Sequence, residues 1–165
     1  MTEAKKQRIV ILGVGNTILT DEGVGVRVLE ILRDRYAFPD NVNLVDGGTL
    51  GLSLLGVVEG ADLLIVIDAV KNQGSPGTLY RLTWDDITGR VRYKDSMHQL
   101  DLVEALTITE LIFERPEIII IGVEPADIST PGLSLTPVIQ AKTQDMVQMV
   151  LTELSHRGIS HHQVG

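Results

Sequence analysis

The sequence predicts an α/β fold: a three-layer sandwich in which a mostly parallel, twisted sheet of five strands lies between helices on both faces. Residues 63–67 and 118–121 are short runs that are apolar at every position, as in strands buried on both faces of a parallel sheet. Residues 23–36 instead carry apolar side chains at every third or fourth position, which is typical of a helix that covers a sheet. Strand and helix patterns alternate without an internal repeat or a linker. The 165 residues are therefore expected to form a single domain.

The remaining elements follow from local patterns. We expect strands at 9–12, 42–45, 63–67, 78–84 and 118–121, and helices at 23–36, 50–59, 102–113 and from 136 to a point before Gly158. Residues 78–84 alternate in polarity after a turn rich in Gly, Pro and Asn, which favours an antiparallel strand near the sheet edge. Thr136 and Pro137 are the N-cap and the first residue of the last helix. Loops are expected at 85–96 and 125–135, and the tail at 156–165 is expected to fray.

Composition limits the classes of function. The net charge is −8, whereas a nucleic-acid binder needs an electropositive face. The chain has no cysteine, so any metal it binds must take oxygen and imidazole ligands. No apolar stretch approaches the roughly 20 residues of a membrane span, and the apolar run after Arg8 is too short for a signal peptide. We therefore expect a cytoplasmic protein that binds neither nucleic acid nor membrane.

The most informative segment is the turn after the first strand, where residues 13–25 read GVGNTILTDEGVG. The third glycine of a dinucleotide-binding motif is missing because Ile18 stands in its place. Asp21 and Glu22 lie where a phosphate would approach the following helix, and they would repel it. The turn therefore favours a cation. A nucleotide-binding α/β protein, with Asp46 as the acid at the ribose, remains an alternative.

Four acidic residues, Glu22, Asp46, Asp68 and Glu124, follow the ends of predicted strands. The carboxyl ends of parallel strands meet at one edge of a sheet, where ligands bind. Each carboxylate alone is more commonly a helix cap or a turn former, but four together repel one another unless a cation joins them. His98 precedes a predicted helix in a loop that should return to this edge, although a lone histidine is more often a surface or capping residue. With Glu22 and Asp68 it would complete a site for a divalent ion such as nickel or zinc.

Several short motifs, taken in order, make the chain similar to the [NiFe]-hydrogenase maturation endopeptidases. They are the glycine-rich opening at 13–26, Asp46-Gly47-Gly48-Thr49, Asp68-Ala69, Pro76-Gly77-Thr78, His98-Gln99, Gly122-Val123-x-Pro125 and Gly132-Leu133-Ser134-Leu135-Thr136-Pro137. Each motif is weak alone, but the ordered set is specific and covers almost the whole chain. The resemblance implies that Glu22, Asp68 and His98 bind the metal and that Asp46 is a further catalytic candidate near the site.

The resemblance also implies a function. Such an enzyme is a hydrolase of the aspartyl or metal-assisted type that removes a short C-terminal extension from the precursor of the hydrogenase large subunit, after nickel has been inserted. The cut falls just after the substrate's Cys-x-x-Cys-x-x-His/Arg segment, and nickel serves as the recognition element, with zinc or cadmium as substitutes in vitro. We expect a monomer. A nickel-carrying metallochaperone is the other alternative, and cleavage of nickel-loaded substrate would separate the two.

Overall fold

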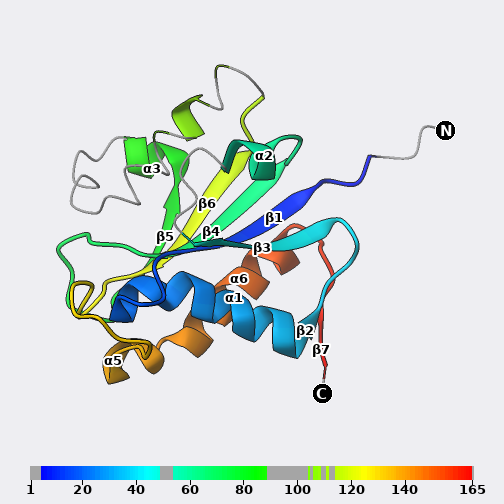
Figure 1. Ribbon diagram of the computed structural model, residues 1–165. Coiled ribbons are helices and arrows are strands. Elements are labelled where there is room, and N and C mark those ends of the chain that lie inside the picture. The colour runs from blue at the N-terminus through cyan, green and yellow to red at the C-terminus, as the bar shows by residue number, and fades with distance from the viewer. Residues whose placement is uncertain are drawn as a thin grey trace.

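The computed structural model describes residues 5–48, 54–88, 104, 106–108, 111 and 114–164 (Figure 1). Its elements, in chain order, are β1 (Ile9–Val14), the 3-10 turn η1 (Thr20–Gly23), α1 (Val24–Arg35), β2 (Tyr36–Ala37), β3 (Val42–Gly48), α2 (Leu54–Val58), β4 (Leu63–Ala69), β5 (Leu79–Thr83), α3 (Trp84–Thr88), β6 (Glu117–Val123), α5 (Pro137–Gln140), α6 (Thr143–His156) and β7 (His162–Gln163). The described residues of the helix expected at 102–113 are also helical.

Five strands form the main sheet in the order β3-β1-β4-β6-β5. The first four are parallel to one another, and β5 runs antiparallel to β6 at the edge. The central strands β1 and β4 are buried at every position, whereas β5 is mostly half-exposed. The predicted fold class, including its single antiparallel strand, is confirmed.

The sheet separates two apolar cores, as the side-chain alternation of its strands requires. In β1, Ile9 and Ile11 face a core shared with α1 and α6, while Val10 and Leu12 face a second core that includes residues of α2 and α3. Figure 1 shows α1 and α6 on one side of the sheet and α2 and α3 on the other. No helix in the described part of the chain is long and apolar enough to cross a membrane.

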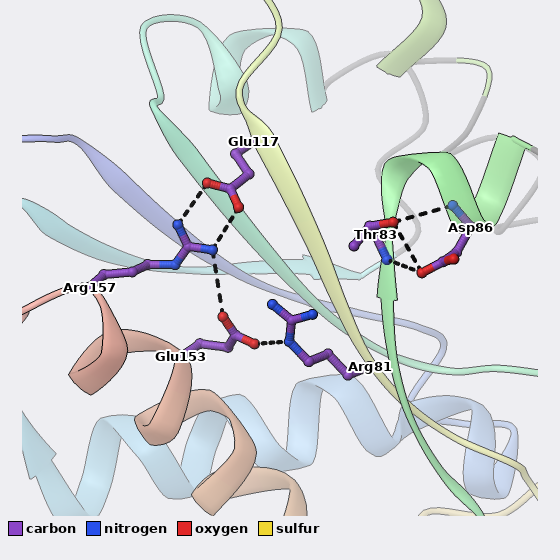
Figure 2. Close-up of polar contacts among 6 residues, drawn as sticks. All are labelled: Arg81, Thr83, Asp86, Glu117, Glu153 and Arg157. Carbon is purple, nitrogen blue, oxygen red and sulfur yellow. Dashed lines mark hydrogen bonds and ion pairs between the residues drawn. The ribbon is translucent and has the colours of Figure 1, made fainter.

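One segment expected to be a loop begins as a helix. Residues 84–88 form α3, although their polar sequence suggested a loop. The helix begins here because Thr83, the residue that precedes it, forms hydrogen bonds with Asp86. Asp86 accepts hydrogen bonds from the backbone N–H and the hydroxyl of Thr83, and the backbone N–H of Asp86 donates to the same hydroxyl (Figure 2). This reciprocal cap satisfies donors at the start of the helix and nucleates it. The rest of the expected loop lies outside the described residues.

The C-terminal part of the chain differs from the prediction in two ways. The single helix expected after Thr136 is two helices. Around Ile139, backbone hydrogen bonds join residues three positions apart instead of four, and this tighter turn ends α5. The tail expected to fray pairs instead, since β7 lies antiparallel to β2. His161 supports this pairing, because its ring lies 6.3 Å from that of Tyr36 and its Nε2 lies 3.0 Å from the hydroxyl of Ser155.

Ion pairs attach the C-terminal end of α6 to the amino end of β6 and to the middle of β5. Arg157 donates two hydrogen bonds of 2.7 Å to Glu117, the first residue of β6, and lies 3.6 Å from Glu153 (Figure 2). Glu153 in turn accepts from Arg81 of β5. The bidentate geometry fixes the helix relative to β6, and the carboxyl edge of the sheet lies at the other end of that strand.

Candidate functional site

The turn after β1 packs closely on the neighbouring strand at the carboxyl edge of the sheet. A Cβ atom at Gly25 would lie 2.0 Å from the carbonyl oxygen of Ile67 in β4 and 2.4 Å from that of Val14 in β1. A Cβ atom at Gly15 would lie 1.7 Å from the carbonyl oxygen of Glu22. Only glycine allows backbones to approach this closely. The two glycines therefore let η1 and the first turn of α1 contact the end of β4.

This packing brings together the segments that carry Glu22 and Asp68. Glu22 lies in η1, one turn before Gly25, and is half-buried. Burial raises the pKa of its carboxyl above the usual 4.5, because a partly desolvated carboxylate is less stable in its charged form. Asp68 directly follows Ile67 and is only 2% exposed. One of its oxygens accepts the backbone N–H of Ala69 at 2.8 Å.

Of the other two predicted site residues, Asp46 and His98, the structure describes only Asp46. Asp46 lies in β3, opposite Gly13 of β1, which in turn pairs with Ile67 of β4. Two strand spacings put its Cα roughly 10 Å from the end of β4. Its side chain is exposed, and Oδ1 accepts the N–H of Gly48 at 3.0 Å. His98 lies outside the described residues. Within the described part of the chain, no three His, Asp or Glu side chains gather closely enough to hold a metal ion.

Glu124, the fourth acidic residue at this edge, holds a loop. It is 5% exposed, and its carboxylate accepts the backbone N–H groups of Asn72 and Gly74 and, at 3.4 Å, the hydroxyl of Tyr80. These donors come from the turn that follows β4 and from β5. The structure thus supports for Glu124 the turn-forming role that the sequence left open.

Asp21, the neighbour of Glu22, is completely buried. Its Oδ2 accepts the backbone N–H groups of Ala126 at 3.0 Å and Asp127 at 2.9 Å, and its Oδ1 accepts the N–H of Thr136 at 2.8 Å. The hydroxyl of Thr136 donates as well, at 2.9–3.0 Å. The sequence placed both Asp21 and Glu22 where a phosphate would approach the helix. The structure separates them, since Asp21 turns inward to the loop after β6.

Chemically, the carboxyl edge offers oxygen ligands and no thiolate, because the chain has no cysteine. Carboxylate oxygens suit a divalent cation, and the desolvation of Glu22 and Asp68 strengthens their attraction for one. Nickel(II) is a borderline ion that takes oxygen and imidazole ligands as well as thiolates, so Glu22 and Asp68 could add oxygen ligands to a nickel ion that a partner molecule already holds. The residues present therefore fit a shared site better than a closed metal site of the protein's own.

Comparison with known proteins gives the family. The model of the HycI hydrogenase maturation protease family matches residues 26–153. The hydrogenase 2 maturation protease of Escherichia coli K12 is 39% identical over 154 residues, which cover 92% of this chain and 93% of that protein. The hydrogenase expression/formation protein HupM of Azotobacter chroococcum is 39% identical over 153 residues, or 92% of this chain and 73% of that protein.

A solved structure agrees with these matches. The structure of the hydrogenase maturating endopeptidase HybD from E. coli superimposes with a TM-score of 0.90 at 37% identity, over 95% of this chain and 98% of that one. The similarity thus extends over nearly the whole fold. It confirms the resemblance that the ordered motifs indicated: this chain belongs to the hydrogenase maturation protease family.

Proposed function

We propose that this protein is a cytoplasmic, monomeric endopeptidase that removes the C-terminal extension of the nickel-loaded large-subunit precursor of a [NiFe]-hydrogenase. In this proposal nickel belongs to the substrate and is the recognition element. Glu22, Asp68 and His98 approach it at the carboxyl edge. The proposal rests on family membership and, above all, on the close packing at Gly25 that holds η1 against the end of β4.

The donor set supports a substrate-borne metal. Nickel held by the thiolates of the substrate keeps coordination positions that oxygen and imidazole ligands can fill. Glu22 and Asp68 provide oxygens from two rigid elements, a helical turn and a buried strand, so that little ordering is needed when the substrate docks. Docking through the metal would place the peptide bond that follows the thiolate segment at the same edge.

Hydrolysis further requires a water molecule with a base to take its proton. Asp46 is exposed to solvent at the end of β3 and is held by Gly48, so we assign it to orienting this water. Burial raises the pKa of Glu22, and a cation beside this partly desolvated carboxylate would stabilise its charged form. A metal at this position supplies Lewis acidity to the carbonyl of the scissile bond.

The decisive experiment is cleavage of purified, nickel-loaded precursor, with the released C-terminal peptide identified by mass spectrometry. Asp68→Asn should abolish release. Its matched control is Asp62→Asn, the same change next to the opposite end of β4, where the side chain is exposed and accepts the N–H of Arg8. That variant should cleave at the parent rate. If Asp68→Asn also cleaves at the parent rate, Asp68 is a structural cap and the proposed ligand set is wrong.

The same assay separates the remaining alternatives. A precursor without nickel should stay uncut, and equal cleavage with and without the metal would contradict recognition through nickel. A metallochaperone would release nickel to the precursor without cutting it. A nucleotide-binding protein would bind a dinucleotide at the turn after β1. There, however, the N–H of Gly15 already donates to the carbonyl of Gly48, and η1 presents the half-buried carboxylate of Glu22.

A further inference from the structure

Asp21 is a buried charge that the proposed chemistry does not use. Burial of a carboxylate is costly unless every lone pair that faces the protein is satisfied. Here all the partners are donors: three backbone N–H groups and the hydroxyl of Thr136. Only an ionised carboxylate accepts on both of its oxygens, because an asparagine would point an NH₂ group at further donors. The position is therefore matched to aspartate rather than to any polar residue.

The partners of Asp21 belong to segments distant in sequence. Ala126 and Asp127 lie in the loop after β6, and Thr136 is the N-cap of α5. The hydroxyl of Thr136 makes no capping bond to its own helix, so its donation to Asp21 is its role in this structure. Asp21 thus fastens η1 to both ends of the loop between β6 and α5.

Backbone contacts reinforce the same attachment. The N–H of Asp21 donates to the carbonyl of Asp127, and Leu19 forms a parallel bridge with Gly132. Between them, Thr20 has a φ of 55°, a left-handed conformation that is unfavourable for a β-branched residue. Strain of this kind persists only where surrounding contacts hold it. The strained residue and the buried charge directly precede Glu22.

We propose that Asp21 is a positioning residue: by fastening η1 to the loop after β6, it fixes Glu22 at the carboxyl edge in the orientation that the substrate's metal requires. This inference deepens the proposed function and rests on it. Neither Asp21 nor Thr136 touches substrate in this account. Both act through the backbone of η1, and their loss lowers the rate by misplacing Glu22.

The test compares three variants in the cleavage assay with nickel-loaded precursor. Asp21→Asn should lower kcat/KM per folded molecule by about tenfold or more, since a misplacement near 1 Å can cost up to 10²-fold. Thr136→Val removes one donor, keeps the shape and sacrifices no helix cap, so its loss should be smaller. Thr136→Ser keeps both donors and should restore the parent rate. In hydrogen exchange, the amides of Ala126 and Asp127 should exchange faster in Asp21→Asn, while those of β4 should not.

A control for destabilisation alone is Glu153→Gln. This carboxylate is likewise buried, at 6% exposure, but its partners are Arg157, which binds the first residue of β6, and Arg81 in the middle of β5 (Figure 2). Glu153→Gln should lower the melting temperature without changing kcat/KM per folded molecule. Equal losses of kcat/KM in Glu153→Gln and Asp21→Asn would show that stability alone controls the rate, and would overturn the inference.

The remaining outcomes separate this inference from the proposed function. If Glu22→Gln stops cleavage while folded Asp21→Asn cleaves at the parent rate, the positioning role is wrong and the proposed function stands. If Glu22→Gln cleaves at the parent rate, the ligand assignment fails and the role of Asp21 fails with it. Should Asp21→Asn not fold, the pair Thr136→Val and Thr136→Ser decides: equal rates in that pair refute the inference.

Discussion

Gly25→Ala is the substitution for which helix propensity and packing predict opposite results. Gly25 is the second residue of α1, and alanine is better than glycine within a helix by at most about 1 kcal/mol. The added Cβ would, however, lie 2.0 Å from the carbonyl oxygen of Ile67 and 2.4 Å from that of Val14. Both are backbone atoms of hydrogen-bonded strands and cannot rotate away. Packing should therefore decide the outcome.

The magnitude follows from the size of the overlap. Real Cβ atoms essentially never approach other atoms within 3.0 Å, so α1 and the sheet must separate by about 1 Å. Overpacking costs about 1–3 kcal/mol, and contact with backbone of two strands places this case at the upper end. After the gain in helix propensity, the net loss is about 2 kcal/mol. In a chain of this size that lowers the melting temperature by about 4–8 °C.

The matched control is Gly56→Ala in α2, where a Cβ would meet nothing within 4 Å. It should gain about 0.5–1 kcal/mol. Thermal melts of both variants, paired with cleavage, test the reasoning: Gly25→Ala should also lose roughly 10²-fold in rate because Glu22 moves with the helix. Equal or higher stability of Gly25→Ala would refute the close packing from which the approach of Glu22 to β4 was deduced.

Three further predictions concern the core and two carboxylates. Ile65→Ala, at a fully buried position, should lose about 2–5 kcal/mol in denaturant titration, while cleavage falls only with the folded fraction; a larger fall per folded molecule would tie the core to the chemistry. Since burial raises the pKa of Glu22, its charge lowers stability increasingly as pH rises through 4.5 and the higher pKa of the folded state. Glu22→Gln should thus melt at or above the parent temperature at neutral pH, with the difference vanishing below pH 4.5; a lower melting temperature at neutral pH would contradict this. Hydrogen bonds from Thr130 and then Ser129 lower the pKa of Asp127 from 3.8 to about 2, so the stabilisation by this carboxylate is present above 3.8 and lost as pH falls towards 2. Carbon-13 NMR titration measures this pKa directly, and a value near 3.8 would mean that the loop is not held as described.

The sheet was predictable because each strand carries its own signal. The runs at β4 and β6 are apolar on both faces and can only be central, while the alternation in β5 marks an edge. The helix α3 was missed because its signal is a reciprocal side-chain cap, Thr83 with Asp86, that outweighs an otherwise polar sequence. The strands β2 and β7 are far apart in the sequence, and each has only two residues. A strand of two residues is too short to show a periodic pattern, so the sequence could not predict this pairing.

The site was predictable only as far as topology determines it. Parallel strands deliver whatever follows them to one edge, so Glu22, Asp46 and Asp68 were expected there. Their environments depend on contacts made by distant segments. The desolvation of Glu22 and the exposure of Asp46 follow from how loops pack around the edge, and sequence spacing contains no information about that. The role of His98 stays a prediction.

Burial does not distinguish a metal ligand from a structural carboxylate at this edge. Asp21, Asp68 and Glu124 are all at most 5% exposed. For Asp21 and Glu124, the hydrogen-bond donors identify a structural role. Asp21 and Glu124 each accept from several backbone N–H groups of a loop beyond the next strand, and in both residues the two oxygens take part. These bonds explain why Asp21 and Glu124 are buried at this edge, because each carboxylate holds a loop. Asp68 accepts the backbone N–H of its neighbour Ala69. Its proposed role at the metal is supported by the family's chemistry and by the close packing at Gly25, which brings the segment of Glu22 to the end of β4.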